Sequence, residues 1–190
     1  MNEILSAVKI LKEGGVIAYP GDTCYALGAN IYDDEAIMKV IKAKGLTVGE
    51  RPFPVAVSGL SQVEDIAHLD ADHRDIIKEL WPNPILFLLP KKSSVSSLLS
   101  GPSNLIGVIQ FQNDIPNKLI QRFGFPITAT SANPSGQKDI SSPNDVEVDN
   151  DMLLKGICLY SGKEWTVVDL FNGQILQDGT LASKVEKFFS

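Results

Sequence analysis

The residues of this chain that could do chemistry carry hydroxyl, amide or charged groups, and they lie beside short apolar runs of sequence. Thr130-Ser131-Ala132-Asn133 follows one apolar run, and Asp22 and Thr23 follow another, while Lys44 stands near the end of an amphipathic segment. Taken singly, Lys44 is a cation that complements a helix dipole, and the Ser and Asn side chains are turn formers. Polar loops on a rigid sheet are nevertheless where binding sites usually lie.

The common catalytic signatures are absent from the sequence. It has no P-loop, no strand-linked G-x-G-x-x-G, no H-E-x-x-H and no nucleophile elbow. Ser135 and Lys138 match S-x-x-K, but the companion motifs of penicillin-binding proteins are missing and the residues between them are typical of a turn. His68 and His73 do not share a helical face, so we expect surface histidines. No catalytic residue and no metal ligand is therefore assigned.

Composition and charge narrow the class of protein. The chain has 190 residues, 44% hydrophobic and 21% charged, which is ordinary for one globular domain spanning residues 1–190. No apolar run approaches the roughly 18 residues of a membrane span, and the N-terminus lacks a signal-peptide pattern, so we expect a soluble cytoplasmic protein. Cys24 and Cys158 are expected to be free thiols. The net charge of −6 argues against non-specific adhesion to nucleic acid, although a local basic cleft stays open.

Helical and strand patterns alternate along the chain. Helices are expected at residues 2–13, from Asp33 or Asp34 through 41, after a capping box at 61–64, near 72–80, near 114–123 and behind Thr180. Strands are expected at 16–19, 53–57, 85–89, 105–111, 127–130, 156–160, 165–170 and 174–177, with Asn172-Gly173 as a hairpin turn. This alternation predicts an α/β fold with a mixed sheet.

Several motifs taken together resemble the YrdC/YciO family. They are GGVIAYPGDTCYALG at residues 14–28, Trp81-Pro82-Asn83-Pro84 and TSANPSG at residues 130–136, and TVVDL at 166–170 is similar to the family's late strand. The proline-rich segment is expected to form a stiff corner with Trp81 in the core. The resemblance covers essentially the whole chain. It implies an open twisted mixed sheet with helices around a concave cleft.

For active family members, the resemblance implies a nucleotidyltransferase that makes threonylcarbamoyl-adenylate from threonine, bicarbonate and ATP with magnesium. This product is the intermediate for threonylcarbamoyladenosine, a tRNA modification. ATP with magnesium is then a bound substrate complex, and no tightly bound cofactor is implied. A carbamate oxygen attacks the α-phosphorus and expels pyrophosphate, so positioning and charge neutralisation suffice without a protein nucleophile.

The resemblance also implies site residues. Lys44 is expected to meet the ATP phosphates, Ser131 the nucleotide or phosphates, and Asn133 to shape the same pocket. Other expected cleft residues are Asp22, Thr23, Tyr25, Arg51 and Thr130.

Several polar positions of the family pattern carry other residues here. They are Gly21 for a threonine, Leu46 for an arginine, Leu86 for a threonine, Ile109 or Gln110 for an arginine, Trp165 for a serine and Gln177 for an arginine. Each lost charge-assisted hydrogen bond is worth roughly 1.5 to 3 kcal/mol, so an altered activity is expected. Three other features are similar to the YciO-like branch of the family. They are Ala26 within YALG, the basic-x-Leu pattern at 44–46 and the longer loop through 49–53.

Three functions remain open on the sequence alone. The first is a nucleotide-binding enzyme of the threonylcarbamoyl-adenylate synthase type. The second is a non-catalytic module that binds double-stranded RNA or tRNA, which the acidic net charge disfavours. The third is a binder of another small anionic metabolite, in which Leu46 and Leu86 make the pocket more apolar. The sequence predicts no oligomeric state.

Overall fold

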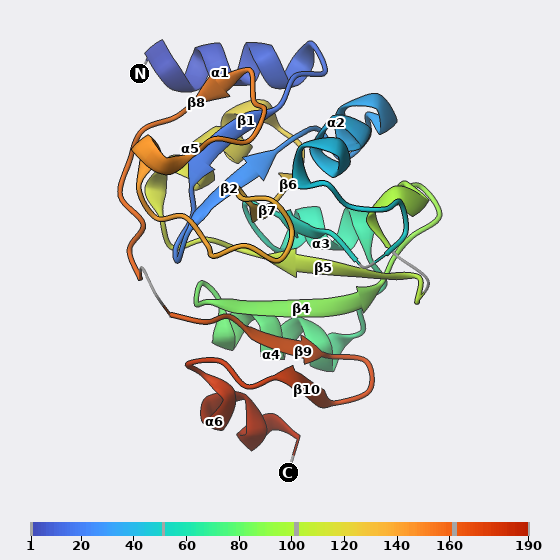
Figure 1. Cartoon of the computed structure of the whole chain (residues 1–190). Helices are drawn as coiled ribbons and strands as arrows, with labels where there is room; N and C mark the ends of the chain where they lie inside the picture. Colours follow the sequence, from blue (N-terminus) through green and yellow to red (C-terminus); the bar gives the residue numbers. More distant parts are fainter. Residues whose placement is uncertain (1, 51, 101–102, 161–162, 190) are drawn as a thin grey trace.

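The computed structural model describes residues 2–50, 52–100, 103–160 and 163–189, and its strands form two mixed sheets (Figure 1). The strands are β1 Ile17–Pro20, β2 Tyr25–Gly28, β3 Pro54–Ala56, β4 Ile85–Pro90, β5 Leu105–Ile109, β6 Ile127–Thr128, β7 Thr130–Ser131, β8 Met152–Leu153, β9 Thr166–Asp169 and β10 Gln174–Gln177. One sheet has the order β7-β2-β1-β8 and the other β10-β9-β4-β5-β3-β6. The predicted α/β class with mixed strand pairing is confirmed, with the strands divided between two sheets.

Six α-helices surround the sheets in the described part of the chain. They are α1 Asn2–Lys12, α2 Asp34–Lys44, α3 Leu60–Ile66, α4 Ala71–Leu80, α5 Asp114–Phe123 and α6 Ala182–Val185. Short 3-10 helices occur at Ser97–Leu99, Pro143–Asp145 and Glu186–Phe188. None of the helices in the described ranges is long and apolar enough to cross a lipid bilayer.

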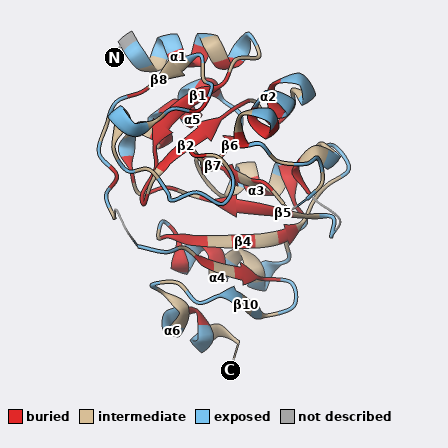
Figure 2. Cartoon of the chain, viewed as in Figure 1, coloured by how far each residue is buried: buried red, intermediate tan, exposed pale blue. Residues whose placement is uncertain are grey.

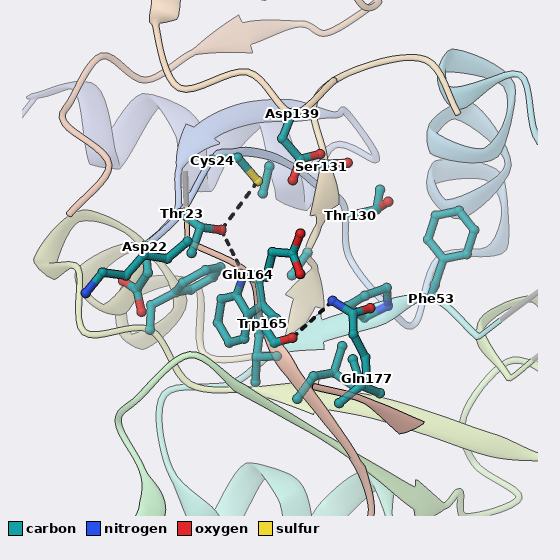
Figure 3. Close-up of a pocket in the computed structure, with 18 of the residues that line it drawn as sticks. Asp22, Thr23, Cys24, Phe53, Thr130, Ser131, Asp139, Glu164, Trp165 and Gln177 are labelled. Atoms are coloured by element: carbon teal, nitrogen blue, oxygen red, sulfur yellow. Dashed lines mark hydrogen bonds between the residues drawn. The ribbon is translucent and has the colours of Figure 1, made fainter. Parts of the chain in front are cut away.

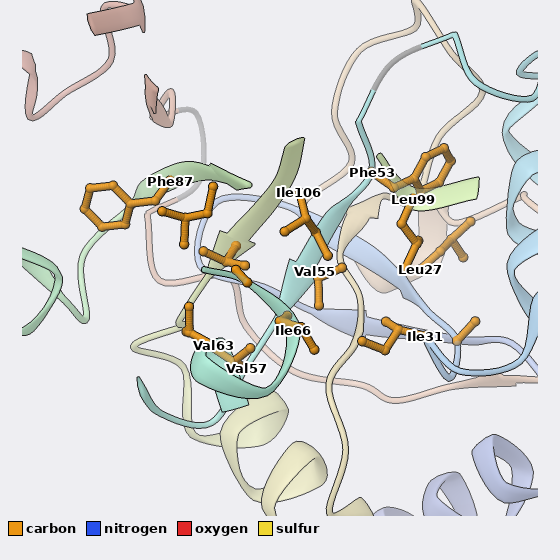
Figure 4. Close-up of a cluster of buried hydrophobic side chains, with 14 of the residues drawn as sticks. Leu27, Ile31, Phe53, Val55, Val57, Val63, Ile66, Phe87, Leu99 and Ile106 are labelled. Carbon is orange, nitrogen blue, oxygen red and sulfur yellow. The ribbon is translucent and has the colours of Figure 1, made fainter. Parts of the chain in front are cut away.

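A large hydrophobic cluster lies between the six-stranded sheet and the helices α3 and α4 (Figures 1 and 4). Val55 on β3 and Phe87 on β4 are fully buried there, together with Val63 and Ile66 of α3. Leu27 of β2 joins the same cluster, so the two sheets share it. Trp81 is 8% exposed and its ring packs 5.6 Å from Phe87, which confirms the expected buried tryptophan at the proline-rich corner.

A second cluster fixes the four-stranded sheet to α1 and α5. Leu11 of α1, Tyr19 of β1 and Leu119 of α5 are fully buried within it. The outward sides of these helices are exposed, whereas the central strands are buried (Figure 2). The amphipathic spacing read from the sequence therefore predicts which helix faces are covered.

Helix α2 brings Lys44 to the pocket, and local signals fix both of its ends. The Asp33 side chain accepts a hydrogen bond from Ala36 N at 3.1 Å, which confirms the predicted start. The helix ends at Gly45, whose φ of 65° lies in the left-handed region that favours glycine. Lys44 is consequently the last helical residue, and its side chain turns inward.

The segment 127–130 connects the two sheets. It was expected as one strand, but it divides at Ala129 into β6, which pairs with β3, and β7, which pairs with β2. Ala129 N donates to Pro54 O at 2.7 Å at the division. The crossing places Thr130 and Ser131 beside the face of the six-stranded sheet.

Some local expectations were wrong. Helix α3 begins at Leu60 with Gly59 as its N-cap, so Ser61 is not a cap, and Gln62 instead accepts from Ser58 N at 2.8 Å. The last helix begins at Ala182, not behind a capping Thr180. Residues 156–160 form no strand. They run beside the β1–β2 loop, where Tyr160 N donates to Asp22 O at 2.6 Å.

Candidate functional site

A pocket of about 520 Å³ lies between the two sheets and has two chemically different sides (Figure 3). The polar wall consists of Asp22 and Thr23 in the β1–β2 loop, Thr130 and Ser131 on β7, and Asp139. The aliphatic floor consists of Leu86 and Leu88 on β4, Ile109 on β5 and Val167 on β9. Other lining residues are Cys24, Ala26, Pro52, Phe53, Pro54, Phe111, Ala129, Lys163, Glu164, Trp165 and Gln177.

Lys44 supplies a buried cation behind the polar wall. Its Nζ donates to Ser131 O and to Asn133 O, each at 2.7 Å, and to Ser131 Oγ at 3.1 Å. The residue is 1% exposed. Burial of an ammonium group without partners is costly, so these oxygens explain how the fold tolerates the charge. The structure thus joins residues that lie 87 positions apart, Lys44 and Ser131.

Asn133 shapes the loop that receives Lys44. Its Nδ2 donates to Pro134 O at 3.1 Å and to Gln137 O at 2.7 Å. Its Oδ1 is buried and has no hydrogen-bond partner within the described ranges. Since buried acceptors are normally paired, this oxygen is suited to receive a hydrogen bond from a buried water molecule.

Asp22 is held at the pocket by the backbone. Its Oδ2 accepts from Gln112 N at 3.0 Å and its Oδ1 from Asn113 N at 2.9 Å. Burial raises the pKa of Asp22 above its ordinary value, and the two N–H donors oppose that rise. The carboxyl group is thereby fixed in position with its two oxygens already engaged.

Trp165 connects the two sides of the pocket. Its Nε1 donates to Thr23 Oγ1 at 2.9 Å, and Gln177 Nε2 donates to its carbonyl oxygen at 3.1 Å (Figure 3). Its ring meets Phe111 edge to face, with the centroids 6.1 Å apart. The indole therefore spans from the start of β9 to the β1–β2 loop.

The two cysteines are protonated at neutral pH. Burial, with a smaller contribution from Asp139, raises the pKa of Cys24 to about 12. Burial likewise raises the pKa of Cys158 to about 11. Both are free thiols, as expected. Because the thiolate is the nucleophilic form, neither sulfur is activated for covalent catalysis.

The charge that lines the pocket is predominantly acidic. The described lining holds three carboxylates, Asp22, Asp139 and Glu164, and one cation, Lys163. The Lys163 Nζ lies 5.1 Å from the Tyr160 ring centroid. Within the described ranges, no group of three or more His, Cys, Asp or Glu side chains is arranged to hold a metal ion. The lining therefore combines carboxylates and hydroxyls with a broad apolar surface.

The residues expected from the sequence fall into distinct places. Lys44, Ser131 and Asn133 form one hydrogen-bonded cluster, and Thr130 lies beside it on the polar wall. Tyr25 is buried away from the lining, where its hydroxyl donates to Gly156 O at 2.8 Å and accepts from Gly156 N at 2.9 Å. Arg51 lies outside the described residues.

Most other lining residues had no role assigned from the sequence. Ile109, Trp165 and Gln177 are departures from the family motifs, and all three line the pocket. Leu86, expected to make the pocket more apolar in a metabolite binder, lines it as well. Cys24, Asp139 and Glu164 were not singled out as site residues. They lie in loops or beside short strands, where no periodic pattern indicates which way a side chain points.

Comparison with known proteins finds relatives that match most of this chain. It is 31% identical over 173 residues to the threonylcarbamoyl-AMP synthase of Pyrococcus abyssi, covering 88% of this chain and 51% of that protein. It is 27% identical over 176 residues to the enzyme of the same name from Cellvibrio japonicus, covering 90% and 93%. The chain therefore spans about half the length of the first relative and nearly all of the second.

Solved structures give the same placement. The structure of P. abyssi Sua5 complexed with L-threonine superposes with a TM-score of 0.91 at 30% identity, covering 98% of this chain and 57% of that one. E. coli YciO superposes with a TM-score of 0.83 at 29% identity, covering 94% and 90%. The family model Sua5/YciO/YrdC, described as telomere recombination, matches residues 9–179. The chain belongs to the Sua5/YciO/YrdC family.

Proposed function

We propose that this chain is a nucleotide-binding enzyme of the threonylcarbamoyl-AMP synthase type, acting in tRNA modification. The observation that carries the proposal is the buried Lys44 ammonium bound to Ser131 Oγ at 3.1 Å, directly behind the pocket wall. A fixed positive charge beside a hydroxyl suits the phosphate groups of ATP, because it neutralises charge without moving during the reaction. The names of the relatives at 27–31% identity support the same reaction class.

The proposed reaction needs no protein nucleophile, which agrees with the protonated cysteines. The amine of the amino acid and bicarbonate give a carbamate and water. A carbamate oxygen then attacks the α-phosphorus of ATP, the bond to the β-phosphate oxygen breaks, and pyrophosphate leaves. The chain binds ATP and the carbamate of the amino acid in one pocket and aligns the carbamate oxygen with the α-phosphorus. The pocket volume of about 520 Å³ lies within the usual range for small-molecule sites, roughly 300 to 1,000 Å³.

The acidic lining is compatible with ATP that arrives as its magnesium complex. Magnesium typically keeps several waters and is held by one or two carboxylates together with substrate phosphates. Asp139 and Glu164 offer such oxygens, whereas both oxygens of Asp22 are engaged by backbone N–H groups. Magnesium is then part of the substrate rather than a resident ion. The same carboxylates repel a bare polyanion, so structured RNA is assigned to a later step and not to this pocket.

The test is release of pyrophosphate by the purified chain with ATP, magnesium, bicarbonate and L-threonine, each omitted in turn. We expect release that needs all four, together with an adenylate product seen by mass spectrometry. Ser131→Ala is expected to lower the rate by about tenfold, because it removes a hydroxyl beside the phosphate site. Ser135→Ala is the matched control, since Ser135 is exposed in the same loop. No release at high enzyme concentration excludes the proposal.

A further inference from the structure

Strand β4 is apolar on both of its faces. Ile85, Phe87 and Leu89 are buried in the core behind the sheet, whereas Leu86 and Leu88 are half-buried and line the pocket. A strand with one free face normally alternates apolar and polar side chains. Leucines on the free face of β4 therefore indicate that apolar surface belongs in the pocket.

The neighbouring strands extend this surface into the aliphatic floor. Val167 on β9 is the register partner of Leu86, and Gly107 on β5 is the partner of Leu88. Gly107 has no side chain, and a Cβ built there would lie 3.1 Å from Leu86 Cδ2. Leu86 thus leans over Gly107, and Ile109 continues the floor along β5.

Two hydrogen bonds beside the floor join neighbouring lining residues to each other. Trp165 Nε1 donates to Thr23 Oγ1 at 2.9 Å, and Gln177 Nε2 donates to Trp165 O at 3.1 Å. The four floor side chains themselves have no hydrogen-bonding atoms. A hydroxyl group that rests on these four side chains loses water and gains no hydrogen bond from them, which weakens binding.

The rim of the pocket complements the charged ends of an amino acid. Asp139 and Glu164 present carboxylates, and Lys163 presents an ammonium. An α-amino group is attracted by the first two and an α-carboxylate by the third. The floor then receives the side chain.

We propose that the aliphatic floor selects an amino acid with an aliphatic side chain, valine or isoleucine, over threonine. The inference rests on the proposed function, because it names the amino acid that the same site carbamoylates. Valine and threonine have nearly the same shape, so the floor accepts threonine with reduced affinity. A hydrophobic pocket discriminates between such isosteres by about 100-fold at most.

The test is calorimetric titration of the purified chain with L-valine, L-isoleucine and L-threonine, without ATP. We expect valine and isoleucine to bind about tenfold or more tightly than threonine. Leu86→Thr should narrow or reverse that ratio, because it supplies a hydroxyl on the floor. Val167→Thr should also narrow or reverse the ratio, because it adds a hydroxyl to the floor with almost no change of shape. Thermal unfolding shows whether each variant is folded. Leu176→Thr is the matched control, since Leu176 is 56% exposed on β10 and lies outside the pocket.

The possible results test the amino-acid preference of the floor and the synthase reaction independently. Threonine binding as tightly as valine, a ratio unchanged in both floor variants, or no binding of any of the three overturns the inference. Pyrophosphate release that needs ATP, bicarbonate and an amino acid leaves the proposed function standing in each of those cases. Preference for valine without pyrophosphate release supports the floor and removes the synthase reaction.

Discussion

The polar wall and the aliphatic floor of the pocket are held in different ways. On the polar wall, Asp22 accepts two backbone hydrogen bonds, Thr23 accepts one from Trp165, and Ser131 accepts two from Lys44, at its carbonyl oxygen and at Oγ. The floor depends only on strand register, as in the pairing of Leu86 with Val167. The wall is therefore preorganised and sensitive to the loss of single atoms, whereas the floor responds to volume and polarity.

The polar wall should be most sensitive to loss of its cation. Lys44→Met keeps most of the side-chain volume and removes the charge, and we expect pyrophosphate release to fall by about 100-fold or more. The carbonyls of Ser131 and Asn133 also lose a donor, which costs about 1 to 3 kcal/mol each in stability. Steady-state kinetics and urea unfolding measure the two effects.

Lys42→Met controls for loss of a lysine from the same helix, because Lys42 is exposed. A folded Lys44→Met protein that turns over at the control's rate would show that the polar wall does not act through Lys44. The charge of Lys44 would then not distinguish the polar wall from the aliphatic floor.

The floor should respond to one added methyl group. In Gly107→Ala the new Cβ lies 3.1 Å from Leu86 Cδ2, so the Leu86 side chain must shift within the floor. We expect affinity for isoleucine to fall by about tenfold and affinity for ATP to change little, as measured by calorimetry. Gly59→Ala is the control, because a Cβ at Gly59 meets nothing within 4 Å. Equal losses for isoleucine and ATP would contradict a floor that contacts only the amino acid.

The hydrogen bond between Thr23 and Trp165 is the link between the two sides, and its energy can be isolated. We expect a double-mutant cycle with Thr23→Val and Trp165→Phe to give a coupling energy of about 1 kcal/mol in urea unfolding. Additive single effects would mean that the 2.9 Å contact contributes nothing net and that the sides are held independently.

The smallest expected effect is a pH dependence at Asp22. Burial raises its folded pKa above the unfolded value, so its contribution to stability is present below the unfolded pKa and is lost as pH rises through the folded pKa. Asp22→Asn removes this loss, so the stability of the variant relative to the parent should improve as the pH rises above about 4. Urea unfolding across that range measures the slope, and a slope of opposite sign would mean that the backbone donors outweigh burial.

Local sequence signals predicted the elements that carry their own caps and periodicity. Helix α2 was readable because Asp33 caps it and Gly45 ends it. Strand β2 was missed, because Tyr25–Gly28 is buried at every position and its pairing with β1 is not visible locally. The start of α3 was misplaced by a capping-box pattern that the fold does not use.

The proximity of three candidate site residues was predictable from motifs, and their binding of ATP stays a prediction. The cluster of Lys44, Ser131 and Asn133 was expected from the resemblance, and the structure brings the three together. Asp139 and Glu164 join the lining from loops far from those motifs. Their positions depend on tertiary packing between segments distant in sequence, which no local pattern encodes.

The pairing of the first strand has a consequence for synthesis on the ribosome. β1 pairs in parallel with β8, and Val16 N donates to Asp151 Oδ2 across 135 positions of sequence. While the chain is being made, the outer edge of β1 has no native partner until most of the protein has emerged. An unpaired apolar edge is a template for association with other chains. Nascent chains stalled before β8 should accordingly need protection by chaperones.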